Sequence, residues 1–411
     1  MQRRNFLLSA AAGLGLAGQP AWSNNSSNSP SGAGLDLGIG KGSAPLYQPT
    51  RYIFVADMMS NFIAVVDLQS GKSVDLLNFG IRPHVMELAR DDDMLAVGSP
   101  QTTELCLMNL KTRQITRMQL PAPTYQLFFV PQSTLLAVGM RDRVGLIDYH
   151  YGSLKVFDRL FDSPQRNTSL ESYYSLLFSS FSQSYWVLDE KKPFIYHKRG
   201  QDPADSAWRE LDFSKRLNIQ GGFDTGVASP EDYLLTFTTE DGTQGLIYFP
   251  ESDKLISTGN MRSTGNTYKP MLTPYIDAYT KNVIFGNKSG NMVHFNLAQN
   301  PDKPERFTVD FSPRIIRSGW LESTWVLGGD KGLTFQSFTD PADRKHYRFV
   351  PEVTNIWVTG DSKTALVTLD EGPPHIIPYD IRTREQLKPI FVSGVAMPAK
   401  VRMGSNNSIC Y

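Results

Sequence analysis

The sequence predicts an all-β chain that folds as an eight-bladed β-propeller closed by its C-terminal strand. Short apolar runs recur at intervals of about 40 to 50 residues, which is the period of one propeller blade. Within the runs apolar residues alternate with polar ones, and β-branched and aromatic side chains are enriched, as in strands. A last strand-like segment at 398–403 is placed to complete the first blade.

The chain begins with a segment that has the features of a removable export signal. Arg3 and Arg4 precede a weakly apolar stretch that ends at Leu16 and is too short to span a bilayer. Small residues at 21–23 offer a cleavage site. The segment resembles the twin-arginine signal family, which implies export of the folded protein to a bacterial periplasm. A short N-terminal anchor is the alternative.

Four regions follow from composition. Residues 1–23 are the predicted twin-arginine (Tat) signal peptide, 24–48 a flexible linker, 49–404 the propeller and 405–411 a tail. The linker is rich in Ser, Asn and Gly and has almost no bulky apolar residues, so it cannot bury enough surface to order itself.

Charge and cysteine content exclude some classes of protein. Removing residues 1–23 deletes two Arg and no acids, which leaves 41 − 2 = 39 basic residues against 41 acidic ones. A net charge near zero argues against nucleic acid as a partner. We expect no transmembrane segment in the mature chain. Two cysteines do not make a disulfide framework, and the sequence leaves open whether Cys106 and Cys410 pair.

The blades can be followed along the chain by their apolar runs. These runs are RYIFVAD at 51, MLAVGS at 94, LLAVGM at 135, SYWVLD at 184, YLLTFTTE at 233, NVIFGNK at 282, TWVLGGD at 324 and ALVTLDE at 365. After a polar turn a second strand follows, for example FIAVVDLQSGK at 62, RVGLIDYHYG at 143 and HIIPYDIRTR at 375. A third strand then precedes the segment that leads into the next run. Four strands per period predict a propeller.

The first two units contain a recognisable sequence motif. They read VADMMSNFIAVVDLQSGK and then GIRPHVMELARDDDMLAVGS. This pattern resembles the YVTN-type propeller repeat, with its Gly-x-x-Pro-His leader. Later units keep the spacing of the strands but do not contain this motif. The resemblance implies a fold and says little about activity, because this repeat accompanies many functions.

Eight units can be counted, and the first lacks an inner strand ahead of residue 51. The segment 398–403 is expected to supply that strand, because closure removes free sheet edges. Seven blades is the alternative, since the divergent unit at 165–213 could be irregular.

Candidate site residues lie in the segments just ahead of each inner strand, where a propeller forms the funnel of its central channel. Cations recur there, and Arg82 and Arg402 are expected to point into solvent. The predicted ligand-binding set is Arg82, His84, Lys269, Arg314, Arg317, Lys400 and Arg402. A basic funnel in a neutral protein favours a small anionic ligand or an acidic periplasmic partner protein. The alternative is that propeller mouths are generally polar.

His84 is the only one of six histidines on a predicted leader. The scattered histidines predict no metal site. In the YVTN pattern the matching histidine commonly has a structural role in a turn, and the alternative is an axial ligand or a proton donor.

Enzymatic motifs are missing. There is no Cys-x-x-Cys-His, Gly-x-Ser-x-Gly or His-Glu-x-x-His, and no phosphate-binding glycine loop. We therefore expect an exported binding or assembly module, with no catalytic residue assigned. The alternative is a cofactor-binding subunit of a periplasmic oxidoreductase, similar to amine dehydrogenase propellers or to the propellers that bind d-type haem. The cofactor, if there is one, is not determined.

Overall fold

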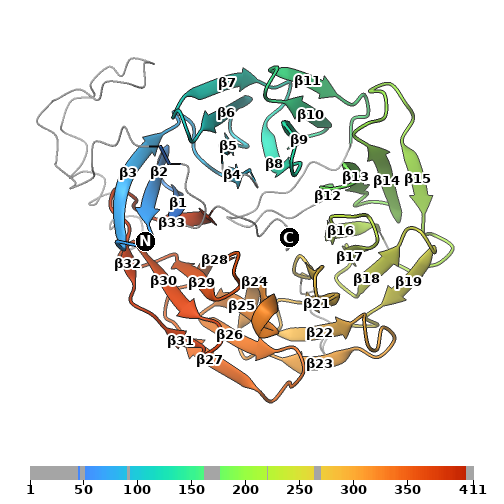
Figure 1. Ribbon diagram of the computed structural model, residues 1–411. Helices are drawn as coiled ribbons and strands as arrows, with labels where there is room; N and C mark the ends of the chain where they lie inside the picture. Colours follow the sequence, from blue (N-terminus) through green and yellow to red (C-terminus); the bar gives the residue numbers. More distant parts are fainter. Residues whose placement is uncertain are drawn as a thin grey trace, which may run out of the picture.

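The strands form eight antiparallel sheets arranged as blades around a central axis (Figure 1). The computed structural model describes residues 45–46, 51–89, 93–161, 176–219, 221–262 and 270–403. The eight-bladed propeller predicted from the sequence is confirmed, and the seven-bladed alternative is wrong. The divergent unit at 165–213 supplies a regular four-stranded sheet, although 162–175 lies outside the described residues.

Each of the first four blades has four strands, in order from the axis outward. Blade 1 is β33 (Pro398–Met403), β1 (Tyr52–Asp57), β2 (Phe62–Asp67) and β3 (Lys72–Asn78); blade 2 is β4 (Val85–Leu88), β5 (Met94–Gly98), β6 (Glu104–Asn109) and β7 (Ile115–Gln119); blade 3 is β8 (Thr124–Phe129), β9 (Leu135–Met140), β10 (Val144–Asp148) and β11 (Ser153–Val156); blade 4 is β12 (Leu176–Ser179), β13 (Ser184–Leu188), β14 (Phe194–Arg199) and β15 (Arg209–Asp212).

The other four blades repeat this order, with a divided outer strand in the last. Blade 5 is β16 (Phe223–Ala228), β17 (Leu235–Thr239), β18 (Gly245–Phe249) and β19 (Lys254–Ser257); blade 6 is β20 (Tyr275–Asp277), β21 (Asn282–Gly286), β22 (Asn291–Asn296) and β23 (Glu305–Thr308); blade 7 is β24 (Ser312–Gly319), β25 (Thr324–Asp330), β26 (Gly332–Ser337) and β27 (Arg344–Arg348); blade 8 is β28 (Val353–Val358), β29 (Thr364–Leu369), β30 (His375–Asp380), β31 (Glu385–Gln386) and β32 (Ile390–Phe391). A short 3-10 helix, η1 (Trp320–Glu322), joins β24 to β25.

The C-terminal strand closes the ring as predicted. β33 pairs antiparallel with β1, and Val55 faces Val401 in this register. In Figure 1 the last strand of the chain lies beside the first. The Asp57 carboxylate fixes the junction because it accepts a hydrogen bond from the backbone N–H of Met397 at 3.0 Å. The inner edge of blade 1 is therefore covered, and no strand edge is left open toward the axis in the part of the chain that the structure describes.

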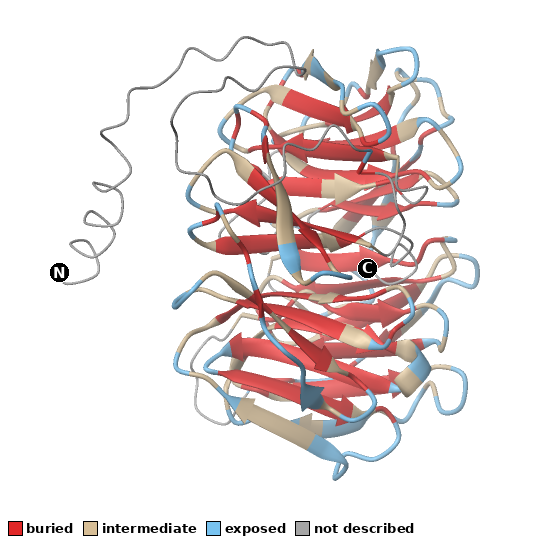
Figure 2. Ribbon diagram, turned by 60° about the vertical axis from the view of Figure 1, so that its left-hand side comes forward, coloured by how far each residue is buried: buried red, intermediate tan, exposed pale blue. Residues whose placement is uncertain are grey.

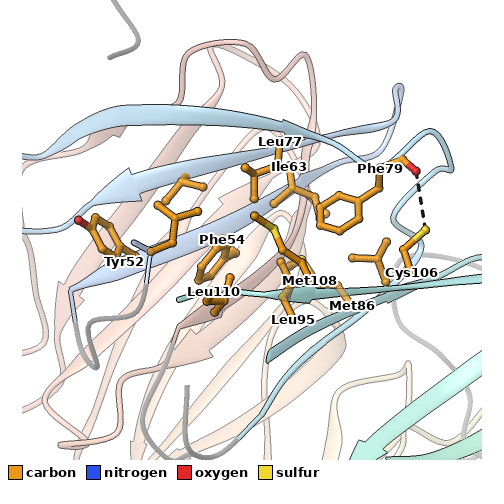
Figure 3. Packing of buried hydrophobic residues seen from close by; sticks show 14 of the residues in the cluster. Tyr52, Phe54, Ile63, Leu77, Phe79, Met86, Leu95, Cys106, Met108 and Leu110 are labelled. Carbon is orange, nitrogen blue, oxygen red and sulfur yellow. Dashed lines mark hydrogen bonds between the residues drawn. The ribbon is translucent and has the colours of Figure 1, made fainter. Parts of the chain in front are cut away.

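Apolar side chains between neighbouring blades form the core. Figure 2 shows buried strands stacked through the molecule, with exposed residues concentrated in the turns. Between blades 1 and 2, Phe54 and Ile63 pack with Met86 and Leu95, which belong to the next sheet (Figure 3). Leu46, inside the stretch predicted as a linker, joins this cluster and donates its N–H to the Leu110 carbonyl at 2.9 Å.

Some expectations concern residues that are not described. The signal peptide, the tail and Cys410 lie outside the described residues. Cys106 is a buried free thiol between blades 1 and 2, and burial raises its pKa to about 11. No helix in the described part of the chain is long and apolar enough to cross a membrane.

Candidate functional site

One end of the ring gathers the segments that lead into the innermost strands. In an antiparallel sheet these leaders lie at the same end as the turns between the second and third strands. We call this end the mouth. Blade 2 illustrates the arrangement, since His84, directly ahead of β4, lies against Ser99, which follows β5.

A cluster of cationic and polar groups lies at the mouth between blades 1 and 2. Its members, called the mouth cluster below, are Arg82, His84, Ser99 and Lys400. His84 Nδ1 lies 3.0 Å from the Ser99 hydroxyl, which also accepts the N–H of Gln101 at 3.2 Å. Burial lowers the pKa of His84, and the charges of Lys400 and Arg82 lower it further. The imidazole is therefore neutral at pH 7 beside two cations.

The two cations of the mouth cluster differ in exposure. Arg82 is exposed, as expected, and its side chain has no ion pair with a described residue. Lys400 is 8% exposed and belongs to the closing strand β33. Two segments at opposite ends of the propeller sequence thus bring their charges to one end of the ring.

Arg402 lies deeper than this cluster, two residues further along β33. Its Nε donates to Glu87 in blade 2 at 3.2 Å, and its guanidinium lies 4.8 Å from the ring centre of Trp357 in blade 8. Because Arg402 touches both neighbouring blades, only 14% of its side chain is exposed. The expectation that it points into solvent is wrong, because an ion pair with Glu87 and a cation–π contact with Trp357 hold its side chain between the neighbouring blades.

Arg402 belongs to a level of the propeller that can be traced around the ring. In seven blades the residue at this level pairs with the third residue of the next strand, for example Arg402 with Phe54, Glu87 with Ala96 and Trp357 with Leu366. In blade 5, Val227 pairs with Thr236, the second residue of β17. We call the eight residues at this level the axial belt. From blade 1 to blade 8 they are Arg402, Glu87, Phe128, Leu177, Val227, Tyr275, Arg317 and Trp357.

The axial belt has two chemically different halves. Blades 3 to 5 supply the buried apolar residues Phe128, Leu177 and Val227. Blades 6 to 8 with blades 1 and 2 supply charged and aromatic residues. There the Arg317 guanidinium lies 5.9 Å from the ring centre of Tyr275, an arrangement like that of Arg402 on Trp357.

The remaining predicted cations are placed differently. Arg314 in β24 forms an ion pair with Glu352, ahead of β28, so its charge is neutralised. Arg317 is part of the axial belt and also donates to the Ile316 carbonyl at 2.7 Å. Lys269 lies outside the described residues. The structure therefore brings Arg82, His84 and Lys400 together and leaves Arg314 and Arg317 in blade 7.

β-bulges interrupt five inner strands close to the mouth. The pairing shifts next to Arg314, Tyr125 and Thr354, and also in β16 and β33. A bulge bends its strand and changes the direction in which side chains point. Two amide oxygens on these strands, Gln126 Oε1 and Asn355 Oδ1, are buried and have no hydrogen-bond partner among the described residues.

Sequence reasoning missed the partners of the predicted cations. Ser99, Glu87, Glu352 and Trp357 each contact a predicted site residue, and all but Ser99 do so from another blade. The available signal was positional, since Glu87 and Trp357 occupy equivalent places in their repeats. The described residues contain no group of three or more His, Cys, Asp or Glu that could hold a metal ion.

No protein-family model and no curated protein matches the chain. Solved structures do match. Dihydro-heme d1 dehydrogenase NirN in complex with DHE is 13% identical, with a TM-score of 0.64 over 89% of this chain and 77% of that one. AztD from Citrobacter koseri, in its apo form, is 10% identical, with a TM-score of 0.55 over 86% and 98% of the two chains. BamB from Moraxella catarrhalis is 13% identical, with a TM-score of 0.54 over 81% and 94%. At these identities the similarity concerns the fold alone, and it establishes this chain as a β-propeller protein.

Proposed function

We propose that this chain is an exported periplasmic binding or assembly protein whose mouth holds a small anion or an acidic segment of a partner protein. The observation that carries the proposal is the grouping of His84 with Arg82 and Lys400 at the mouth, where, among the described residues, the charges that act on the imidazole are those of these two cations. A largely buried cation such as Lys400 attracts an anion more strongly than a cation on an open surface, because less water screens it.

The surroundings of the mouth cluster support the same proposal. Arg402 and Arg314 already have carboxylate partners in Glu87 and Glu352, so the protein itself neutralises their charges. The mouth cluster contains no carboxylate. An anion bound there would be attracted by the charges of Arg82 and Lys400.

A second candidate function is a cofactor-binding subunit of a periplasmic oxidoreductase, with d-type haem as the cofactor. The similar solved structure of NirN was determined in complex with DHE, and the present chain has an imidazole at its mouth. Neutral His84 has a ring nitrogen that is able to coordinate iron, and the nearby cations suit the carboxylates of a tetrapyrrole.

The experiment is purification of the full-length protein from its native periplasm, followed by absorbance spectroscopy and mass spectrometry of bound molecules. Titration with sulfate, citrate and a poly-glutamate peptide then measures anion binding. Arg82→Glu should weaken binding at least about tenfold, equivalent to about 1.4 kcal/mol, and reduce its dependence on salt. Lys303→Glu, an equal charge change at an exposed residue between β22 and β23, is the matched control.

The outcomes separate the two candidates. Weakened binding in Arg82→Glu but not in Lys303→Glu supports an anion site at the mouth. A Soret band in the purified protein supports the haem candidate. A colourless protein that binds none of the three probes and carries no partner contradicts both.

A further inference from the structure

We propose that the mouth captures an anion together with a proton, which His84 takes up as the anion binds between Arg82 and Lys400. This inference rests on the proposed function, because it describes how the same site is regulated. It assigns His84 a role as a titrating ligand in addition to its hydrogen bond in the turn.

The geometry of the imidazole supports this role. Nδ1 is engaged by the Ser99 hydroxyl at 3.0 Å, which orients the ring. Nε2 has no hydrogen bond with a described residue. A protonated imidazole would donate from both nitrogens, from Nδ1 to Ser99 and from Nε2 to the anion. The Ser99 oxygen is able to accept a hydrogen bond from Nδ1–H as well as the one from Gln101, because it has two lone pairs.

The electrostatics set the direction of the coupling. Before an anion binds, burial disfavours the charged imidazole, and the cations Lys400 and Arg82 disfavour it again. An anion between these cations cancels their repulsion and adds an attraction, so it raises the pKa of His84. By reciprocity, protonation of His84 must strengthen anion binding by the same factor. Affinity should therefore rise as the pH falls.

Two other histidines do not contribute a proton between pH 5.5 and 8. Burial lowers the pKa of His197 and of His294 to about 4, so both stay neutral in this range. His375 lies at the start of β30, the third strand of blade 8, beside the Phe391 ring. The carboxylates Glu87 and Glu352 form ion pairs with Arg402 and Arg314.

The test is calorimetric titration of the full-length protein with sodium sulfate between pH 5.5 and 8 at constant ionic strength. Sulfate suits this test because it stays doubly charged across the range. Two buffers with different ionisation enthalpies report the number of protons taken up. We expect affinity to rise as the pH falls, by at most about tenfold per pH unit, with uptake of up to one proton.

Two variants assign the proton. His84→Asn retains a side chain that can hydrogen-bond Ser99 but cannot titrate, so its affinity should not vary with pH and it should take up no proton. His375→Asn is the matched control and should behave as the unchanged protein does. Circular dichroism checks that both variants fold.

The failures of the two proposals can be distinguished. Sulfate binding that is independent of pH, without proton uptake, overturns the coupling and leaves the anion site standing. A pH dependence that survives in His84→Asn also overturns it. The absence of sulfate binding at every pH contradicts the anion site and, with it, the coupling.

Discussion

The two halves of the axial belt occupy the same backbone positions and use opposite chemistry. In blades 3 to 5 the belt residues are apolar and buried, and Phe128 packs on Phe178 of the next blade with ring centres 5.5 Å apart. On the other side, Arg402 joins Trp357 and Glu87 across three blades. The blades fold alike in both halves, so the fold does not depend on which chemistry fills this level. The same repeat can therefore carry apolar core residues in one half of the axial belt and charged residues in the other half.

The largest effect is expected from deleting 398–411, which removes the closing strand together with Lys400 and Arg402. Val401 and Met403 are buried, and burying one such side chain contributes about 1.5–3 kcal/mol. The deletion also leaves the ladder of β1 without a partner. We expect a loss of at least about 5 kcal/mol, measured by chemical denaturation. A chain that ends at Met403 is the control, and equal stability of the two truncations would contradict the closure.

A smaller effect should follow from Phe128→Ala in the apolar half. Removing a buried phenylalanine typically costs about 3–5 kcal/mol, because it leaves a cavity. The mouth cluster lies in blades 1 and 2, so sulfate affinity should stay the same while the melting temperature falls. Arg82→Glu should show the reverse pattern. If Phe128→Ala weakened sulfate binding in the folded protein, the two halves of the belt would not be independent.

The smallest effect concerns Asp277, at the end of β20 just after the belt residue Tyr275. Its carboxyl is fully buried, and burial raises its pKa. Ionisation therefore costs more in the folded state, and stability is lost as the pH rises from below the ordinary carboxyl pKa through the raised one.

Asp277→Asn should accordingly raise the melting temperature at pH 7, and the gain should vanish in acid. Asn retains an oxygen to accept the N–H of Thr280, which lies 3.1 Å from the carboxylate. Asp361→Asn, an exposed aspartate in the equivalent turn of blade 8, is the control. A less stable Asp277→Asn at pH 7 would mean that a cation compensates the carboxylate.

The sequence was sufficient for the fold because each blade repeats local rules. Alternation, turn residues and a fixed period predict strands one by one, and closure by 398–403 follows from the missing inner strand of blade 1. These signals are local, and they predicted the strands of blade 4 correctly although the repeat motif is absent there.

The candidate site was predicted only in part, because contacts between blades leave no local signal. The sequence placed Arg82, His84 and Lys400 in leaders or inner strands, but it could not show that Glu87 and Trp357 surround Arg402. Nor could it show that Arg314 meets Glu352, 38 residues later in the next blade (352 − 314 = 38). Only the three-dimensional arrangement shows which of the predicted cations form ion pairs with carboxylates of other blades.

The pairing of β33 with β1 also determines when the molecule is finished during synthesis. Asp57 binds Met397, which is 340 residues further along the chain. At roughly 5–20 residues per second, the first blade lacks its inner strand for about 20 to 70 seconds after its other strands have been made. Joining segments so distant in sequence is also a slow folding step. The ribosome therefore adds Lys400 to the mouth cluster long after Arg82 and His84 have been made, and a chain that ends early lacks both the closing strand and this lysine.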